Sequence, residues 1–204
     1  MNRSNSPYKG SGALTRAQFL FYEMRTTAKL MADGLSDEEI IERIASDNLF
    51  QFPTEKSVKQ ITRDCLKNLH ALNNHTLVEA LVTSDSVTAK QIYLYAMMKT
   101  YRLVWDFMIT VIGEKYRQQD YSYHRRDIIV FLMRLQEQDD DVATWSESTC
   151  KKIASVLSRL LIENEYIDNG RSTVLNTVLI SRILENEIRE SGQEIALAAF
   201  NCLA

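Results

Sequence analysis

The chain of 204 residues is long enough to bury a sizeable core, in one large domain or two small ones. Hydrophobic residues make up 45% of it and charged residues 25%, as in ordinary soluble proteins, while only 6 Gly and 2 Pro favour helix over sheet. The net charge of −3 excludes a uniformly basic surface, so any binding to nucleic acid has to come from local basic faces.

The sequence also bounds the location of the protein. No apolar run approaches the ~20 residues that a membrane span needs, and the N-terminus shows no signal peptide. Cys65, Cys150 and Cys202 lie far apart and none belongs to a CxxC pair, as expected for reduced thiols. We therefore expect a cytoplasmic protein that does not cross a membrane.

The N-terminal part predicts an arm and a first helix. Residues 1–12 are polar and rich in Gly and Ser, which is typical of a flexible arm. Thr15 and Gln18 have the spacing of a capping box, which predicts a helix that runs to about Ala32 and ends before Gly34.

The next segment resembles a helix-turn-helix in its order of elements. Ser36 and Glu39 form a second capping-box pattern, in front of a short helix that directs Ile40, Ile41 and Ile44 inward. A connector with Phe50 in the core then leads to a longer helix. We interpret residues 13–75 as a helix-turn-helix-like unit, although this connector is longer than the usual turn.

The remaining residues predict a connector and a second unit. Residues 76–121 have a helical pattern of aromatic and Met side chains, which indicates a buried central connector. Residues 122–204 predict a winged-helix-like unit, because two helices are followed by a turn signal at Asn169 and Gly170 and by β-forming residues. The predicted fold is thus mainly α, with two helix-turn-helix or winged-helix-like units, a central helical segment and a small C-terminal β-hairpin.

Two stretches far apart in the sequence have nearly the same capped, amphipathic helix. The first runs from an N-cap at Thr54 to Leu72 and the second from Ser146 to about Asn164, each with a glutamate in its first turn. Opposite the apolar side each helix presents a basic, hydrogen-bonding row, and this combination fits the major groove of DNA. A capped helix whose basic face is merely solvated has the same pattern, so this alternative stays open.

The two rows assign a role to each polar side chain. In the first row we expect phosphate contacts from Lys56, Lys59, Arg63 and Lys67, and base-edge contacts from Ser57 and Gln60. The second row supplies Lys151, Lys152, Ser155 and Arg159, and the wing supplies Arg171. His124 precedes Arg125 and Arg126, which favours a phosphate-side residue over a catalytic base.

The sequence shows no reactive constellation at diagnostic spacing, since it has no GxGxxG, no P-loop and no HExxH. His70 and His75 have no Cys or carboxylate pair in ligand register. The acidic run Asp139–Asp141 lacks the glycine turn and alternating ligands of a Ca²⁺ loop. We therefore expect a non-enzymatic protein without catalytic residues, metal or cofactor.

Several segments in order resemble one known family. They read SGALTRAQFLFYE, GLSDEEIIERI, NLFQFPTEKSVKQI, AKQIYLYAMMKTYRL and WSESTCKKI. Over roughly residues 12–168 they resemble the BrxA family of the BREX phage-resistance systems of bacteria. The resemblance implies a small cytoplasmic accessory protein that binds double-stranded DNA. It would act beside a methyltransferase, an ATPase and a phosphatase-like component to mark host DNA and block phage replication.

Other functions fit the same residues. The helices, or the apolar tail Ile195–Leu203, could dock other BREX components, and the net charge of −3 suits such a protein-interaction adaptor. A transcriptional regulator of the defence operon is a further alternative, and it predicts one preferred DNA site.

Overall fold

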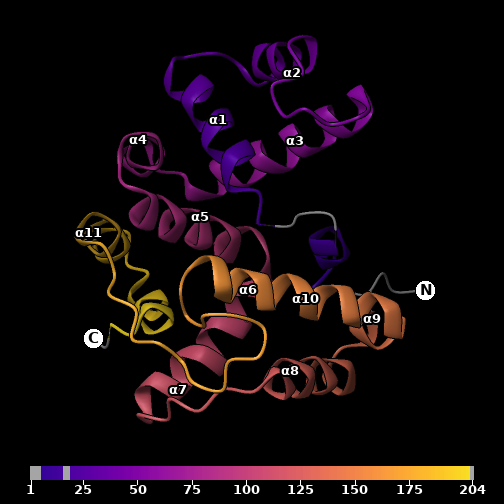
Figure 1. Ribbon diagram of the computed structural model, residues 1–204, viewed down its shortest axis with the longest axis vertical. Coiled ribbons are helices and arrows are strands. Elements are labelled where there is room, and N and C mark those ends of the chain that lie inside the picture. Colours follow the sequence, from indigo (N-terminus) through magenta and orange to yellow (C-terminus); the bar gives the residue numbers. More distant parts are fainter. Residues whose placement is uncertain (1–5, 16–18, 203–204) are drawn as a thin grey trace. The chain divides into compact units, whose positions relative to one another are not determined.

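A computed structural model describes residues 6–15 and 19–202 and is mainly helical there, as the composition predicts (Figure 1). Contacts divide the chain into two compact units. The N-terminal unit is Leu20–Thr100, and the C-terminal unit is Tyr101–Ala204 together with the described part of Met1–Phe19. Residues 76–121, the predicted connector, are divided between them. The division into units at residues 13–75, 76–121 and 122–204 stays a prediction.

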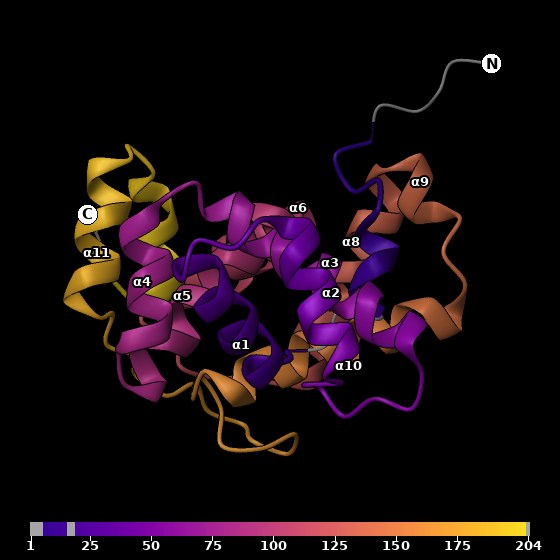
Figure 2. The ribbon, with the colours of Figure 1, turned by 90° about the horizontal axis from the view of Figure 1, so that it is seen from above.

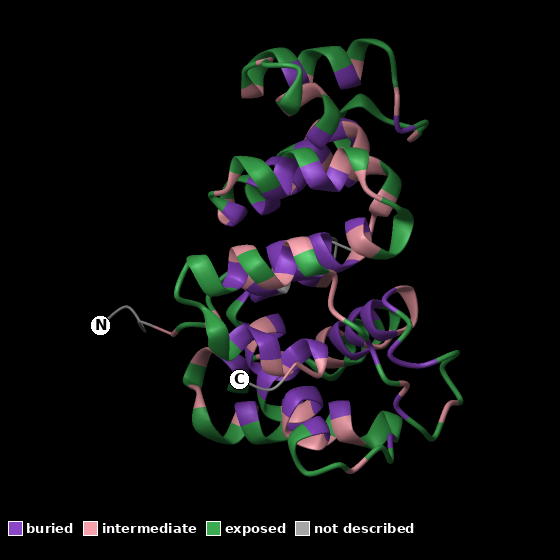
Figure 3. Cartoon of the chain, turned by 90° about the vertical axis from the view of Figure 1, so that its left-hand side faces the viewer, coloured by how far each residue is buried: buried purple, intermediate pink, exposed green. Residues whose placement is uncertain are grey.

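The N-terminal unit is a group of helices around one long central helix. α3 (Glu55–Leu72) packs against α1 (Phe21–Ala32), α2 (Asp37–Ser46) and α5 (Ser86–Thr100). α4 (His75–Thr83) packs against α1 and α5. Most helices in both units bury one side and expose the other (Figure 3), whereas α5 is buried on every side from Gln91 to Met98. Amphipathic packing of this kind stabilises helices of these lengths.

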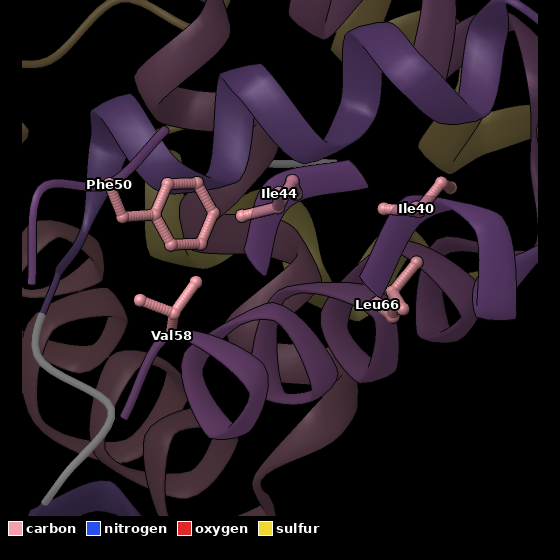
Figure 4. Close-up of a cluster of buried hydrophobic side chains, with 5 residues drawn as sticks. All are labelled: Ile40, Ile44, Phe50, Val58 and Leu66. Atoms are coloured by element: carbon pink, nitrogen blue, oxygen red, sulfur yellow. The ribbon is translucent and has the colours of Figure 1, made fainter. Parts of the chain in front are cut away.

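A small apolar cluster joins α2 and α3. Ile40 and Ile44 from α2 meet Val58 and Leu66 from α3, and Phe50 of the connector closes the cluster (Figure 4). All five side chains are buried, so the predicted core role of Phe50 is confirmed. The cluster fixes α2 on α3. Together with α1 and α5, α2 covers much of α3 and leaves one side, with Lys56, Arg63 and Lys67, exposed. The connector from Asp47 to Thr54 is long for a helix-turn-helix, and that assignment stays a prediction.

Local capping signals in this unit are confirmed in one case and wrong in another. Ser36 and Glu39 form the expected capping box, with the Ser36 N–H donating to the Glu39 carboxylate at 2.8 Å. The box expected at Thr15 and Gln18 is wrong, because Thr15 belongs to a 3₁₀ turn and α1 begins only at Phe21. Gln18 itself lies outside the described residues.

The C-terminal unit contains a bent helical rod and a helix pair. The rod runs through α6 (Arg102–Phe107), a π-helical turn (η2, Met108–Gly113) and α7 (Glu114–Arg117). α8 (Arg125–Gln138) packs against α10 (Glu147–Glu163) and the short α9 (Asp140–Ala143). α11 (Arg182–Glu190) lies beside the last turn, η3 (Glu194–Phe200), in both views of the ribbon (Figures 1 and 2). η1 (Ser11–Thr15) packs on α10.

The described part of the predicted flexible arm is held by hydrogen bonds. The Tyr8 hydroxyl donates to the Asp106 carboxylate at 2.8 Å, and the Ser6 hydroxyl donates to Asp139 at 2.9 Å. Burial, and then the bond to Asp106, raise the pKa of Tyr8 to about 12. Residues 1–5 of the arm lie outside the described residues. The contacts of Tyr8 and Ser6 hold the segment that precedes η1, and η1 packs against α10.

The predicted C-terminal β-hairpin, and with it the winged helix, is wrong. Within residues 6–15 and 19–202 the structure has no strand, only an isolated antiparallel bridge between Ser122 and Val174. The Tyr123 N–H donates to the Thr173 carbonyl at 2.9 Å beside that bridge. The chain after Asn169–Gly170 therefore pairs with the segment before α8 at this bridge. It meets the segment before the turn at a separate backbone bond, where the Asn176 N–H donates to the Tyr166 carbonyl at 2.8 Å. A single bridge forms no ladder, so no wing results.

A helix that crosses a membrane is long and predominantly apolar. None of the described helices combines the length and the apolar composition that crossing a membrane requires.

Candidate nucleic-acid interface

The first basic row lies on the solvent side of α3, as predicted. Thr54 caps the helix, its side chain accepting from the Ser57 N–H at 3.2 Å. Val58, Cys65 and Leu69 are buried on the opposite side. The row itself is exposed at Lys56, Ser57, Gln60, Arg63 and Lys67. Arg63 and Lys56 form no hydrogen bond or ion pair with any described residue, so their charges face solvent.

Lys59 differs from its neighbours in the row. Its ammonium lies 2.6 Å from Glu55 and 3.7 Å from Glu42 of α2, and its side chain is 29% exposed. The hydrogen bond to Glu55 is the main cause that raises the pKa of Lys59. Lys59 therefore links α3 to α2 through Glu42, while its contact with Glu55 stays within α3. A phosphate contact from Lys59 would have to compete with both carboxylates.

The predicted base-reading side chains of this row are also engaged. The Ser57 hydroxyl lies 2.8 Å from the Thr54 hydroxyl, and the Gln60 amide donates to Asp64 at 3.3 Å. Both contacts are on the exposed surface, where exchange with another partner costs little. The arrangement suits backbone contacts better than strict base readout.

The second basic row lies on α10 and is fully exposed. Ser146 caps the helix as predicted, accepting from the Thr149 N–H at 3.2 Å. The row consists of Lys151, Lys152, Ser155 and Arg159. Opposite it, Ile153, Leu157 and Leu161 are buried against the rest of the unit, which confirms the predicted apolar side.

Two cations of this row have acidic neighbours one helical turn away. Lys151 lies 2.6 Å from Glu147, and Arg159 lies 3.3 Å from Glu163. The bond to Lys151 lowers the pKa of Glu147. Lys152 forms no ion pair with any described residue. Exposed pairs of this kind contribute about 0.2–1 kcal/mol and are readily replaced by a phosphate.

The row borders two shallow hollows. One, of about 490 Å³, is lined by Thr15 of η1 and, from α10, by Lys151, Lys152, Ser155, Val156 and Arg159. The other, of about 390 Å³, is lined by Arg125 of α8 and, from α10, by Ser155, Ser158, Arg159, Ile162 and Glu163. From the sequence, His124 is expected on the phosphate side because Arg125 and Arg126 follow it, whereas Arg125 itself is not named as a contact. Its position against α10 follows from the packing of α8, which no local pattern contains.

Arg171 is not part of this surface. It is exposed in the loop after α10, where its N–H donates to the Asn169 side chain at 2.9 Å. It lines a separate hollow formed by Asp168–Val174 and Asn176. The DNA contact expected of Arg171 depended on a wing, and the described residues form no wing.

The sequence also contains acidic and histidine side chains of the kinds that bind a metal ion or take part in catalysis. No three His, Cys, Asp or Glu side chains within the described ranges are grouped to hold a metal ion. Asp139 of the acidic run caps α9, accepting from the Val142 N–H at 3.0 Å. His70 contacts Asp37 at 2.9 Å on the surface of the N-terminal unit. These polar groups have structural partners.

Comparison with known proteins places the chain in a family. A model of the BrxA family matches residues 7–192. A Bacillus cereus (strain H3081.97) protein named BREX protein BrxA is 33% identical over 178 residues, covering 86% of this chain and 88% of that relative. A protein of the same name from Paramagnetospirillum magneticum (strain ATCC 700264 / AMB-1) is 22% identical, covering 86% and 87%.

The fold has also been seen in a crystal. The structure of an uncharacterized protein from Magnetospirillum magneticum has a TM-score of 0.78 and 20% identity, and the match covers 93% of this chain and 96% of that one. That likeness establishes the common fold. The family match over most of the chain establishes more: this protein belongs to the BrxA family of the BREX phage-defence systems.

Proposed function

We propose that this protein is a non-enzymatic accessory component of a BREX system that binds double-stranded DNA through the basic rows of α10 and α3. The observation that supports this most directly is the hollow beside α10. Its lining includes Lys151, Lys152 and Arg159, and no acidic residue. In a chain with a net charge of −3, such a concentration of exposed positive charge suits a polyanion.

The proposed contacts are mainly to the sugar-phosphate backbone. Lysine and arginine side chains at a surface hollow can bind phosphate oxygens without reading a sequence. Ser57 and Gln60 are already bonded to neighbours on α3, which favours little preference among sequences. If about six phosphates are neutralised, the logarithm of affinity falls against the logarithm of salt with a slope near −5.

A mobility-shift titration of the full chain tests this function. Random-sequence duplexes should bind with similar affinity, and raising the salt from about 50 to 200 mM should weaken binding steeply. A duplex from the defence operon serves as the specific competitor. A flat salt response would remove the electrostatic mechanism, and one strongly preferred operon site would identify a regulator instead.

A protein-interaction adaptor is the second candidate, and one surface favours it. Ile129 and Met133 lie one turn apart on α8 and are 46% and 55% exposed. Exposed apolar side chains at that spacing can pack against a partner helix. Charge reversal at Lys152 and Arg159 discriminates, because it weakens DNA retention under the first proposal and leaves capture of BREX components intact.

A further inference from the structure

The two hollows beside α10 adjoin each other. Ser155 and Arg159 line both of them, so the first hollow, next to Thr15, and the second, next to Arg125, meet at these two side chains. We call the combined surface, lined by the residues of both hollows, the α10 groove. α10 supplies most of its lining, and η1 and the start of α8 flank it on either side.

Positive charge is distributed along the whole α10 groove. Lys151 and Lys152 line its first part, Arg159 lies at the junction and Arg125 lies in the second part. Glu163 is the acid in the lining, and it is already bonded to Arg159 at 3.3 Å. The groove therefore has a surplus of cations throughout its length.

Arg125 lines the α10 groove because α8 packs against α10. It is exposed, and its guanidinium forms no hydrogen bond or ion pair with any residue in the described ranges. It faces Ser155, Ser158 and Arg159 across the second hollow. The Ser155 hydroxyl donates to the Lys151 carbonyl at 2.9 Å, so the donors that the hollow offers are the two guanidinium groups. Two arginines at one exposed hollow suit the oxygens of a phosphodiester.

Resting on the proposed DNA binding, we infer that Arg125 is a further phosphate contact and that one DNA backbone crosses α10 along the α10 groove, from the side of Thr15 to that of Arg125. In this arrangement η1 and α8 flank the phosphate backbone on either side, and Lys152, Ser155 and Arg159 of α10 contact it. Binding in the groove is consequently independent of base sequence.

Charge reversal of Arg125 tests this inference on the full chain. Arg125→Glu should weaken binding to every duplex by about tenfold, the cost of one charge-assisted contact, and make the salt slope shallower by about one. Arg125→Lys should restore most of the affinity. The matched control is Arg182→Glu on α11, an exposed arginine with the same charge change outside the groove. Circular dichroism and thermal melting confirm that each variant is folded.

The possible results separate the inference from the proposed function. If the unaltered protein retains no duplex at low salt, both are overturned. If it binds duplex while Arg125→Glu and Arg182→Glu behave alike, Arg125 is not a contact and only the inference fails. A further arm uses inorganic pyrophosphate as competitor: displacement of DNA at equal phosphate concentration would mean that the groove binds isolated phosphate groups, which overturns the extended backbone path.

Discussion

The basic side chains of the two rows differ in how free they are to bind a phosphate. Lys152 and Arg63 have no acidic partner among the described residues, whereas Lys151 lies 2.6 Å from Glu147 and Lys59 lies 2.6 Å from Glu55. A phosphate can replace an exposed carboxylate, but the displaced acid stays one turn away and repels the incoming anion. Under the proposed function, the acids next to the rows would set part of the DNA affinity.

Glu147→Gln should therefore strengthen DNA binding. The substitution frees Lys151 and removes a negative charge from the edge of the α10 groove, and we expect a gain of about two- to fivefold in affinity. Fluorescence anisotropy with a random duplex measures it. Glu190→Gln on α11 makes the same charge change elsewhere on the unit. Equal gains in the two variants would show that only net charge matters.

The three cysteines differ in exposure, and we expect them to differ in reactivity for that reason. Cys65 is 3% exposed, and burial raises its pKa to about 12, whereas Cys150 and Cys202 are partly exposed. Because the thiolate is the nucleophile, a maleimide at about pH 8 should modify Cys150 and Cys202 first and Cys65 only after unfolding. Mass spectrometry of peptides follows each site. Rapid labelling of Cys65 in the folded protein would contradict the packing of α3 against α1.

At the scale of elements, the sequence predicted what local patterns determine. The N-caps Thr54 and Ser146 were identified correctly because a cap needs only a side chain and an N–H a few residues later. The hairpin prediction failed because the partner of Val174 is Ser122, on the far side of α8 and α10 in the sequence. Turn and strand propensities do not identify a partner so distant.

The candidate site shows the same limit. Periodicity correctly placed Lys151, Lys152, Ser155 and Arg159 on one exposed side of a helix, because that follows from helical geometry alone. The α10 groove was not predictable, since it requires the packing of η1 and α8 against α10. The acidic partner of Lys59 on α2 was hidden for the same reason.

The turn before α8 gives a prediction about pH. The Asp120 carboxylate accepts from the Ser122 hydroxyl at 2.6 Å and from the Lys115 ammonium at 3.1 Å. The bonds from Ser122, and then Lys115, lower the pKa of Asp120 from 3.8 to about 2. A lowered pKa in the folded state means that its stabilisation is present above pH 3.8 and is lost as the pH falls towards 2.

Asp120→Asn should accordingly be less stable than the unaltered protein at neutral pH, with the difference disappearing as the pH falls through that window. Urea unfolding at several pH values measures the difference in free energy of unfolding. Glu194→Gln, at an exposed acid of η3, is the control and should change stability little. A constant difference across the window would mean that the Asp120 charge does not support the turn.

At the scale of the whole molecule, each unit supplies one basic row. α3 belongs to the N-terminal unit and α10 to the C-terminal unit, so a protein with a net charge of −3 presents positive charge on both. Under the proposed function, contacts from both rows to one duplex would increase affinity through effective concentration beyond that of either row alone. The dependence of binding on salt reports how many phosphates both rows neutralise together.

Paired charge reversals determine whether both rows act on the same DNA. Lys56→Glu/Arg63→Glu alters the α3 row and avoids Lys59, which contacts Glu42 of α2. Lys152→Glu/Arg159→Glu alters the α10 groove. We expect each pair to reduce the salt slope by about two and the combination of both pairs to reduce it by about four, because phosphate contacts add. If the α3 pair leaves slope and affinity unchanged, the C-terminal unit alone holds the duplex. If the combined variant behaves like one pair, the rows bind separate duplexes rather than one.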